Sequence, residues 1–494
     1  MPSPPNARAT WSVLLLISCV ALISARAAAE EPHPTDRPES SALRVLRLPH
    51  SAPLADSAPA THSTASVRTT DSPGRTEAWS EHRTALRLGV PLPDPPPLAA
   101  EASADYLTLA ELEQLAAASN PTLAQAARNI EALRGKYVQT GLYPNPVAGY
   151  LGEEIGDEGT AGQQGAFVAQ EFVTAGKLRL NRAVVSHEIA AARRQWEIQR
   201  RRVINDVRAA AYRTMAAQRT VTLQKNLVAI GREGVDTAQR LLEAREVSRV
   251  DLLEARIELQ SAQLKLDNAR NDHVAAWQQL AAVVGIAGME RQPLEDKLEQ
   301  TPAELTWGEA LSRLLGHSPE LAKAWSEVER ARCNVARQRA GRVPNIELEA
   351  GTRFNNASED TVASVSVAVP LKLFDRNQGN IHRAYAELTA ARREVQRVEL
   401  AIQHRLADAM NRYENAQQQV RHYRDEILPT ATESLALVQR GYADGEFGYL
   451  ELLTSQRTYF QTSLDYVNSL ENLWLATSRI DGMLLSGGLT RPGE

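Results

Sequence analysis

The sequence predicts a mainly α-helical, internally duplicated chain that carries four β-strands. Two observations support this prediction. A heptad pattern typical of a long packed helix occurs twice, 200 residues apart. Ahead of each copy lie two short segments in which apolar and polar residues alternate, which is the period of a β-strand. Because the whole pattern repeats, we expect one architecture built from two halves rather than several unrelated domains.

The heptad segments pair a track of large residues with a track of mostly small ones. A strict seven-residue period imposes a left-handed supercoil, and small residues let helix axes approach closely. In the first copy the large track is Leu252, Leu259, Leu266, His273 and Leu280, interleaved with Ala255, Ala262, Ala269, Ala276 and Val283. In the second it is Leu452, Tyr459, Tyr466, Leu473 and Ile480, interleaved with Ser455, Thr462, Ser469, Ala476 and Met483.

Composition and cysteine content narrow the class of protein. The chain has 494 residues, a formal net charge of −5 and 5% aromatic residues. This mildly acidic balance gives no reason to expect nucleic acid as a partner. Only Cys19 and Cys333 are present. A mature chain that has lost Cys19 therefore has no internal disulfide and must be stabilised by packing and assembly.

The N-terminus has the composition of an export signal. Arg8 precedes an apolar run over residues 11–23, and three alanines ending at Ala29 provide a cleavage site, so residues 1–29 are predicted to be a signal peptide. The alternative is a lipobox that makes Cys19 a lipid-anchored N-terminus, but the apolar run continues past this cysteine. Residues 30–105 are rich in Pro, Ser, Ala and Thr and are predicted to form a disordered extension.

Each structural repeat opens with helices and a β-hairpin. The first repeat is predicted over residues 106–300 and the second over 301–486, followed by a C-terminal tail at 487–494. Asn120-Pro121 and Ser318-Pro319 each combine an N-cap residue with proline at the first helical position. Hairpins are expected at about 146–172 and 345–371, with strands long enough for the membrane-spanning range.

The second hairpin has one charged and one apolar face. Its charged residues Glu347, Glu349 and Arg353 are expected to face a water-filled lumen. The apolar residues Ile346, Leu348 and Phe354 alternate with them and are expected to face lipid.

Very long helices follow the hairpins. They are predicted at 177–245 and 378–442, with a kink at Pro429, and each would extend roughly 100 Å at 1.5 Å per residue. Short breaks then separate them from the heptad helices at 249–286 and 448–486. The helix before each hairpin and the heptad helix, stacked end to end, nearly match the long helix in length. Each repeat is therefore expected to be a helical hairpin capped by a β-hairpin.

The strand number predicts an assembly. Four strands leave two open edges, and unpaired backbone groups in lipid cost several kcal/mol each. Three chains would close a 12-stranded barrel, an even number within the known range. The fold class expected is thus mainly α with a membrane β-barrel. Three chains would form a homotrimer in which the long coiled-coil-like helices build an α-helical barrel attached to the 12-stranded barrel in the lipid.

Several segments carry a family resemblance. They are residues 244–255 (AREVSRVDLLEA), 441–445 (GYADG) with 449–453 (YLELL), and 369–371 (VPL) followed by 374–379 (FDRNQG). Over about residues 107–485 the chain resembles the TolC-like outer-membrane efflux proteins, the outer-membrane factors of tripartite pumps. The first break is most similar to the heavy-metal resistance–nodulation–division branch. One departure is Arg245, which stands where the second copy has Gly445.

The resemblance implies a passive channel in the outer membrane that extends into the periplasm. Its partners would be a periplasmic adaptor (membrane fusion protein) and an inner-membrane resistance–nodulation–division pump, with heavy-metal cations as one substrate class. The alternatives are a drug-efflux or type I protein-secretion channel and, less favoured, a periplasmic coiled-coil structural or adaptor protein. An adaptor should have one helical hairpin interrupting a lipoyl-like domain, and the sequence has no such interruption.

The breaks between helices are the expected partner-contact tips. They comprise Glu246, Val247, Ser248, Asp251, Gly445, Glu446, Phe447 and Gly448. Two interpretations of the nearby acids remain open: an acidic gate, or caps that solvate helix starts. These acids are Asp251, Glu254, Asp444 and Glu451.

An enzyme is not expected. His187-Glu188 begins a zinc-protease-like string, but Ala191 occupies the place of the second histidine. The sequence has no nucleophile elbow, P-loop or paired-cysteine metal site, so no cofactor and no resident metal are predicted.

Overall fold

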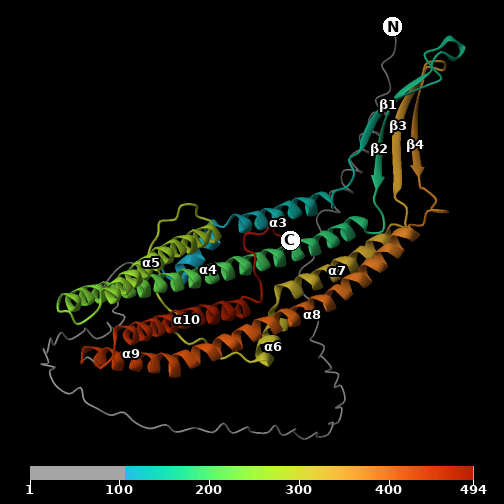
Figure 1. Ribbon diagram of the computed structural model, residues 1–494. Helices are drawn as coiled ribbons and strands as arrows, with labels where there is room; N and C mark the ends of the chain where they lie inside the picture. The colour runs from blue at the N-terminus through green and yellow to red at the C-terminus, as the bar shows by residue number, and fades with distance from the viewer. Residues whose placement is uncertain (1–105, 445, 493–494) are drawn as a thin grey trace, which may run out of the picture. The chain divides into compact units, whose positions relative to one another are not determined.

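The structure is a computed structural model that describes residues 106–444 and 446–492. These residues belong to one compact unit, Pro95–Glu494. It is mainly helical with one four-stranded sheet, which confirms the coarse fold class predicted from the sequence (Figure 1). The predictions of a signal peptide, a lipidated Cys19 and a disordered extension concern residues outside the described part.

One antiparallel sheet joins the two repeats. Its strands are β1 (Val147–Glu153), β2 (Gln163–Phe172), β3 (Ile346–Asn355) and β4 (Asp360–Ala368), in the order β1-β2-β3-β4. The central pairing of β2 with β3 connects strands from different repeats. β1 and β4 are the edge strands, each paired on one side only within the described chain.

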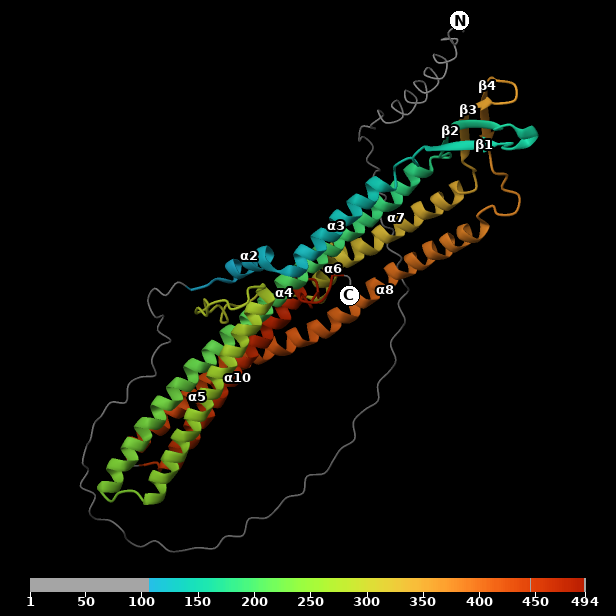
Figure 2. The ribbon, with the colours of Figure 1, turned by 90° about the horizontal axis from the view of Figure 1, so that it is seen from above.

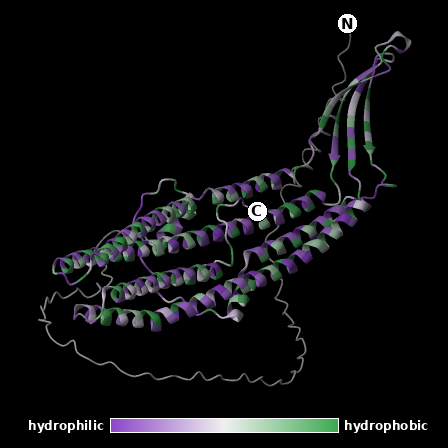
Figure 3. Ribbon diagram, viewed as in Figure 1, coloured by the Kyte–Doolittle hydropathy of each residue, from purple (hydrophilic) through white to green (hydrophobic). Residues whose placement is uncertain are grey.

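The register gives the sheet two chemically different faces. Directly opposite residues share a face, so one face carries Tyr150, Val168, Leu348, Ala350, Phe354, Val365 and Val367. The other carries Glu153, Glu171, Glu347, Glu349, Arg353 and Ser366. Figure 3 shows hydrophobic and hydrophilic segments along these strands. The alternation is clearest in β3 and β4, since Leu151 and Phe167 of the first repeat lie on the charged face and Gln164 and Gln170 on the apolar one.

The first repeat supplies four helices. They are α2 (Leu109–Ser119), α3 (Pro121–Gln139), α4 (Lys177–Glu243) and α5 (Arg249–Val284). Thr108 and Glu111 form a reciprocal capping box that starts α2. Asn120 accepts a hydrogen bond from the Thr122 amide, and Pro121 takes the first helical position of α3.

The second repeat has the same order with one interruption. Its helices are α6 (Trp307–His317), α7 (Pro319–Ala340), α8 (Gln378–His422), α9 (Leu428–Ala443) and α10 (Tyr449–Asp481). A π-helical turn over Tyr423–Ile427 separates α8 from α9 and lies just before Pro429. The predicted kink at this proline thus corresponds to a widened turn, because proline cannot donate the backbone hydrogen bond of a regular helix.

Three helices end earlier than the sequence indicated. α4 stops at Glu243 because Arg245 adopts φ 63°, a left-handed conformation that ends a helix. α5 stops at Val284 because Gly285 has φ 90°. α10 stops at Asp481, five residues short of the predicted end, because Met483 and Leu484 both have positive φ. Backbone conformation after a helix is set by tertiary contacts that periodicity does not reveal.

The helices continue the strand order below the sheet. α3 packs on α4, α4 on α7 and α7 on α8, so four neighbouring helices follow the four strands (Figures 1 and 2). Farther along, α5 packs on α4, α4 on α10 and α10 on α9. None of the described helices is long and apolar enough to cross a membrane.

The core lies where the long helices α4, α5, α8 and α10 pack against the short helices α2 and α6. Its largest buried residues include Leu112, Met215, Leu280, Leu314, Ile402, Leu406 and Tyr413. Smaller apolar clusters follow the heptad helices toward their ends, around Leu266 and Phe460 and around Leu252 and Ala255. The large track of the first heptad copy therefore packs within the chain, as its period predicts.

The chain end is fastened to α4. The carboxylate of Asp206 accepts hydrogen bonds from the amides of Gly487 and Gly488, at 3.1 and 2.6 Å. Gln199, which is fully buried, donates to the carbonyl of Gly488 at 2.8 Å. This segment crosses from the second repeat to the first and helps hold them together.

Candidate functional site

The first tip is a tight turn between α4 and α5. The Arg245 amide donates to the carbonyl of Leu242 at 3.0 Å, and the Glu246 amide donates to that of Leu241 at 2.9 Å. These are the two bonds of a Schellman motif, with arginine in the left-handed position that glycine usually occupies. The replacement of glycine noted in the sequence therefore leaves the turn type unchanged.

A capping box begins the helix after this turn. The Ser248 side chain accepts from the Asp251 amide at 3.3 Å, and the Asp251 carboxylate accepts from the Ser248 amide at 2.8 Å. Both interactions satisfy backbone donors that the helix start would leave unpaired. Asp251 is thus engaged in a cap, one of the two interpretations left open by the sequence.

The second tip shares one backbone hydrogen bond with the first, from Glu446 to Gly441 in place of Glu246 to Leu241. The amides of Glu446 and Phe447 donate to the carbonyl of Gly441, at 2.7 and 3.2 Å. A Cβ at Gly441 would overlap the Phe447 ring, so glycine is required there. Gly448 is the N-cap of α10 and provides no side-chain hydrogen bond. The two tips therefore share this backbone hydrogen bond and differ in how the following helix is capped.

Two tyrosines connect the second tip to acids on α5. The rings of Tyr442 and Tyr449 lie 6.4 Å apart between centroids. Burial raises the pKa of Tyr442, and the charge of Asp251 raises it further. Burial also raises the pKa of Tyr449, with smaller contributions from Tyr442, Glu258 and Glu254. Both phenols therefore stay protonated at neutral pH.

An ion pair joins the heptad helices of the two repeats. Arg457 of α10 donates to Glu258 of α5, whose side chain is only 12% exposed. The hydrogen bond to this carboxylate raises the pKa of Arg457. Neither residue was predicted from the sequence, because the pair depends on how the two repeats pack.

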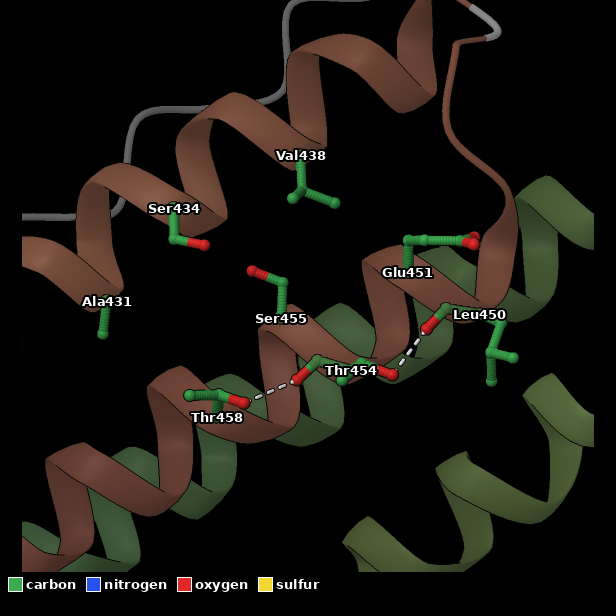
Figure 4. Close-up of a pocket in the computed structure, with 8 residues that line it drawn as sticks. All are labelled: Ala431, Ser434, Val438, Leu450, Glu451, Thr454, Ser455 and Thr458. Carbon is green, nitrogen blue, oxygen red and sulfur yellow. Dashed lines mark hydrogen bonds between the residues drawn. The ribbon is translucent and has the colours of Figure 1, made fainter. Parts of the chain in front are cut away.

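A groove of 420 Å³ runs between α9 and α10 near the second tip. In Figure 4, Ser434 of α9 and Ser455 of α10 point toward one another across it. The hydroxyl groups of Thr454 and Thr458 donate to backbone carbonyls one turn earlier, at 2.8 and 3.0 Å, so their donors are already hydrogen-bonded. The remaining lining residues are Ala431, Val438, Leu450 and Glu451. Small and hydroxyl side chains leave space here that larger residues would fill.

The predicted acidic residues are distributed over both tips. Glu254 and Asp444 are exposed, Glu451 lies in the groove, and Asp251 caps α5. Among the described residues, no group of three His, Cys, Asp or Glu side chains is arranged to hold a metal ion.

The charged face of the sheet gathers the other predicted residues. Glu347 and Glu349 lie on it with Arg353, which forms an ion pair with Glu153 of β1 at 2.5 Å. Glu171 of β2 lies directly opposite Glu347 and was not singled out from the sequence. Two carboxylates facing each other repel, which is tolerable on a face in contact with water.

The opposite side of α5 from its packed seam is apolar and exposed. Val250, Leu253, Ile257 and Leu264 are each between 47% and 66% exposed. In the second copy Leu453, Phe460 and Val467 are buried within the chain, but Leu450, which corresponds to Val250, is 63% exposed. This apolar side is therefore mostly buried within the chain in the second copy and exposed in the first.

The chain belongs to the family of outer membrane efflux proteins. Residues 112–286 and 310–484, which correspond to the two repeats, match this family. It is an outer-membrane efflux channel that extends into the periplasm, a passive conduit rather than an enzyme. As an outer-membrane factor, it belongs to a class that works with adaptors and inner-membrane pumps.

Curated relatives and solved structures agree with this assignment. The chain is 28% identical over 386 residues to the cobalt-zinc-cadmium resistance protein CzcC of Cupriavidus metallidurans, covering 77% of this chain and 91% of that protein. It is 27% identical over 305 residues to the nickel-cobalt-cadmium resistance protein NccC of Alcaligenes xylosoxydans, covering 58% and 66%. The outer membrane protein VceC of Vibrio cholerae superposes with a TM-score of 0.62 at 17% identity, covering 77% of this chain and 96% of that one.

Proposed function

We propose that three copies of this chain form the outer-membrane conduit of a tripartite efflux system that exports heavy-metal cations. The observation that carries the assembly is the sheet of four strands with two unpaired edges. An edge strand exposes a row of unpaired backbone groups, which lipid does not tolerate. Pairing β4 of one copy with β1 of the next closes a barrel of 12 strands.

The helices support the same assembly. The apolar face of α5 stays exposed although other sides of this helix contact α4, α2 and α10. α9 forms the other end of the helical row and exposes Leu437. Packing α5 against α9 of the next copy would bury both faces and close the helical tube, in step with the barrel above it.

The two faces of the sheet then have different surroundings. The face bearing Glu347, Glu349 and Arg353 borders the lumen, and the face bearing Ile346, Leu348 and Phe354 borders lipid. The ion pair of Arg353 with Glu153 supports this, because a water-filled lumen accommodates exposed charge at little cost. With Glu171 added, the lumen of the lower barrel is lined by carboxylates that suit the passage of cations.

The tips are the proposed contact site for the periplasmic adaptor. Glu246, Val247 and Ser248 lie in one turn, and Glu446, Phe447 and Gly448 lie in the other; Gly445, also predicted to contact the adaptor, is outside the described residues. The groove between α9 and α10 opens beside the second turn, and its small side chains fit the ridge of a partner helix. We assign the stronger contact to the second tip, because Phe447 is 43% exposed there.

The acids near the tips bias the gate in this proposal. Glu254, Asp444 and Glu451 from three copies repel one another, and screening within about 8 Å limits this to close neighbours. The carboxylate of Asp251 adds to this repulsion while it caps α5. The ion pair of Glu258 with Arg457 holds α5 against α10 and therefore opposes the repulsion. Opening would separate these two helices.

The substrate assignment follows the relatives. CzcC and NccC are described as resistance proteins for cobalt, zinc, cadmium and nickel. Since an outer-membrane channel carries what its pump delivers, the test is genetic. A strain lacking this gene should accumulate cadmium or cobalt and lose resistance, and the wild-type gene should restore it. Unchanged metal content together with lost drug resistance would point to a drug-efflux channel instead.

A further inference from the structure

Charge is unevenly distributed at the junction between the sheet and the helices. We call this region the junction belt: residues 134–145, 173–187, 337–345 and 369–385. It contains eleven Lys or Arg residues and one acid, Asp375, whereas acids outnumber bases in the whole chain, 60 to 55. The basic residues are Arg134, Lys136, Lys177, Arg179, Arg182, Arg337, Arg339, Arg342, Lys372, Arg376 and Arg383.

Few of these cations are neutralised within the chain. Among the described residues, salt bridges reach Arg134, Lys136 and Arg383 only. Arg182 and Arg339 instead lie over the rings of Tyr137 and Tyr385, at 5.7 and 5.2 Å from the ring centres. The belt therefore presents a strong positive field from all four segments that meet below the strands.

The two repeats bring their cations close together. Burial lowers the pKa of Lys177, and the nearby charge of Lys372 from the other repeat lowers it further, while the carboxylate of Glu171 at the end of β2 partly opposes both. Lys177 donates to the carbonyl of Val343 at 2.6 Å and to Asn345 at 2.5 Å, so the chain gives it neutral acceptors. An anion at this level would relieve the repulsion between the repeats.

Apolar side chains accompany the cations. Leu371, Leu373 and Phe374 flank Lys372 in the segment between β4 and α8, and they are 79%, 62% and 91% exposed. Basic residues interleaved with exposed leucine and phenylalanine are typical of a segment at the headgroup level of a membrane, where apolar groups enter the acyl region and cations stay with the phosphates.

The far end of the sheet has the opposite charge. The two turns there carry Glu153, Glu154, Asp157, Glu158, Glu359 and Asp360. The amide of Asn356 donates to the carbonyl of Gly162 at 3.1 Å, so the two turns are joined. Arg353 is the nearest cation and is paired with Glu153. Only the helix end of the sheet has the charge that attracts an anionic membrane surface.

We propose that the junction belt binds anionic phospholipid headgroups of the periplasmic leaflet, with Leu371, Leu373 and Phe374 inserted beneath them. The four belt segments adjoin the ends of the four strands, so lipid that surrounds the strands would border the belt. Binding fixes the height of the sheet in the membrane and thereby the depth to which the tips extend. This proposal rests on the outer-membrane location of the chain and not on the identity of the exported substrate.

The test measures lipid retention by the full-length protein in detergent. Palmitoyl-oleoyl phosphatidylglycerol or phosphatidylcholine is titrated, and bound lipid is counted by native mass spectrometry. The belt variant is Arg342→Gln/Lys372→Gln/Arg376→Gln. The control, Arg392→Gln/Arg393→Gln/Arg412→Gln, removes the same charge from exposed positions farther along α8.

Wild type and control should bind phosphatidylglycerol more tightly than phosphatidylcholine, and the belt variant should lose this preference by at least about tenfold, since each cation near an anionic surface contributes about fivefold. Equal retention by belt variant and control overturns the proposal. So does loss of the assembly in the belt variant with its lipid preference intact, which would make the belt a contact between copies.

A second measurement locates the apolar segment without removing any charge. In Phe374→Trp, fluorescence should be quenched by brominated phosphatidylglycerol beyond the level of the native tryptophans. A tryptophan that phosphatidylglycerol cannot quench overturns the insertion of this segment. Both measurements are independent of metal export, so a wrong substrate assignment leaves them unaffected.

Discussion

Arg245 is a residue whose conformation and identity conflict. It adopts φ 63° at the end of α4, a region that costs a non-glycine residue about 1–2 kcal/mol. Two hydrogen bonds hold it there: its own amide donates to the carbonyl of Leu242, and the amide of Glu246 donates to that of Leu241. The second tip has glycine at the matching position. The strain therefore comes from having arginine rather than glycine at this left-handed position.

Replacing this arginine tests the strain. Arg245→Gly should stabilise the first tip by up to about 1 kcal/mol, because the relief of strain exceeds the added flexibility of the unfolded chain. Arg245→Val should destabilise it, since a β-branched residue tolerates positive φ poorly. Hydrogen exchange of the Glu246 amide measures the local opening. Faster exchange in the glycine variant would contradict the assignment.

His273 interrupts the leucine track of α5. Its Nε2 is buried without a hydrogen-bond partner among the described residues, and burial lowers its pKa, with a smaller contribution from Arg291. A folded pKa below that of the unfolded chain means that the unfolded state binds more protons. Stability is therefore complete above the unfolded pKa of about 6.5 and decreases as pH falls toward the lower folded pKa.

His273→Leu should remove this pH dependence and restore the heptad. We expect the variant to be more stable by about 1 kcal/mol at neutral pH, because a buried unpaired polar group is replaced by an apolar one. Thermal unfolding of wild type and variant at pH 7.5 and pH 5.5 measures both effects. An unchanged difference between the two pH values in the variant would place the acid sensitivity elsewhere.

At the scale of elements, α5 and α10 are coupled by the pair of Glu258 with Arg457. The pair is held by one half-buried partner and one exposed partner, so its coupling should be modest, on the order of 1 kcal/mol. Glu258→Gln and Arg457→Gln should each loosen the tip and raise the leak conductance in planar bilayers. The double variant should be no worse than either single one, whereas additive effects would show that the two residues act separately.

The sheet supplies a second prediction at this scale. A cysteine at Glu349 should react with a water-soluble maleimide entering through the pore, and a cysteine at Leu348 should not. The two positions are adjacent in β3 and lie on opposite faces. Labelling of Leu348→Cys alone would mean that the apolar face borders water and the charged face borders lipid.

Periodicity revealed the elements better than their ends and contacts. Alternation in β3 and the heptads of α5 fix which residues share a face, because those periods follow from backbone geometry. They do not reveal that Met483 and Leu484 turn the chain after α10, or that a π-turn precedes Pro429. The capping box of Ser248 and Asp251 was legible in the sequence. The ion pair of Glu258 with Arg457 was not, because it depends on how the two repeats pack.

At the scale of the whole molecule, the two repeats contact each other both in the sheet and between their long helices. β2 pairs with β3, α4 packs on α7 and on α10, and each contact joins one repeat to the other. In the proposed ring, β1 pairs with β4 of the next copy, and the outer face of α5 packs against that of α9. Two complementary open edges on one chain are the geometry of a ring, in which each copy completes its neighbour.

The ring is the central claim, and the mass of the assembly tests it most directly. Native mass spectrometry of the detergent-extracted protein should show three chains, with the β-sheet signal in circular dichroism intact. Removing the apolar face of α5 with Ile257→Glu/Leu264→Glu should weaken the trimer without unfolding the chain. A wild-type protein that remains a stable monomer with its sheet intact would contradict the account.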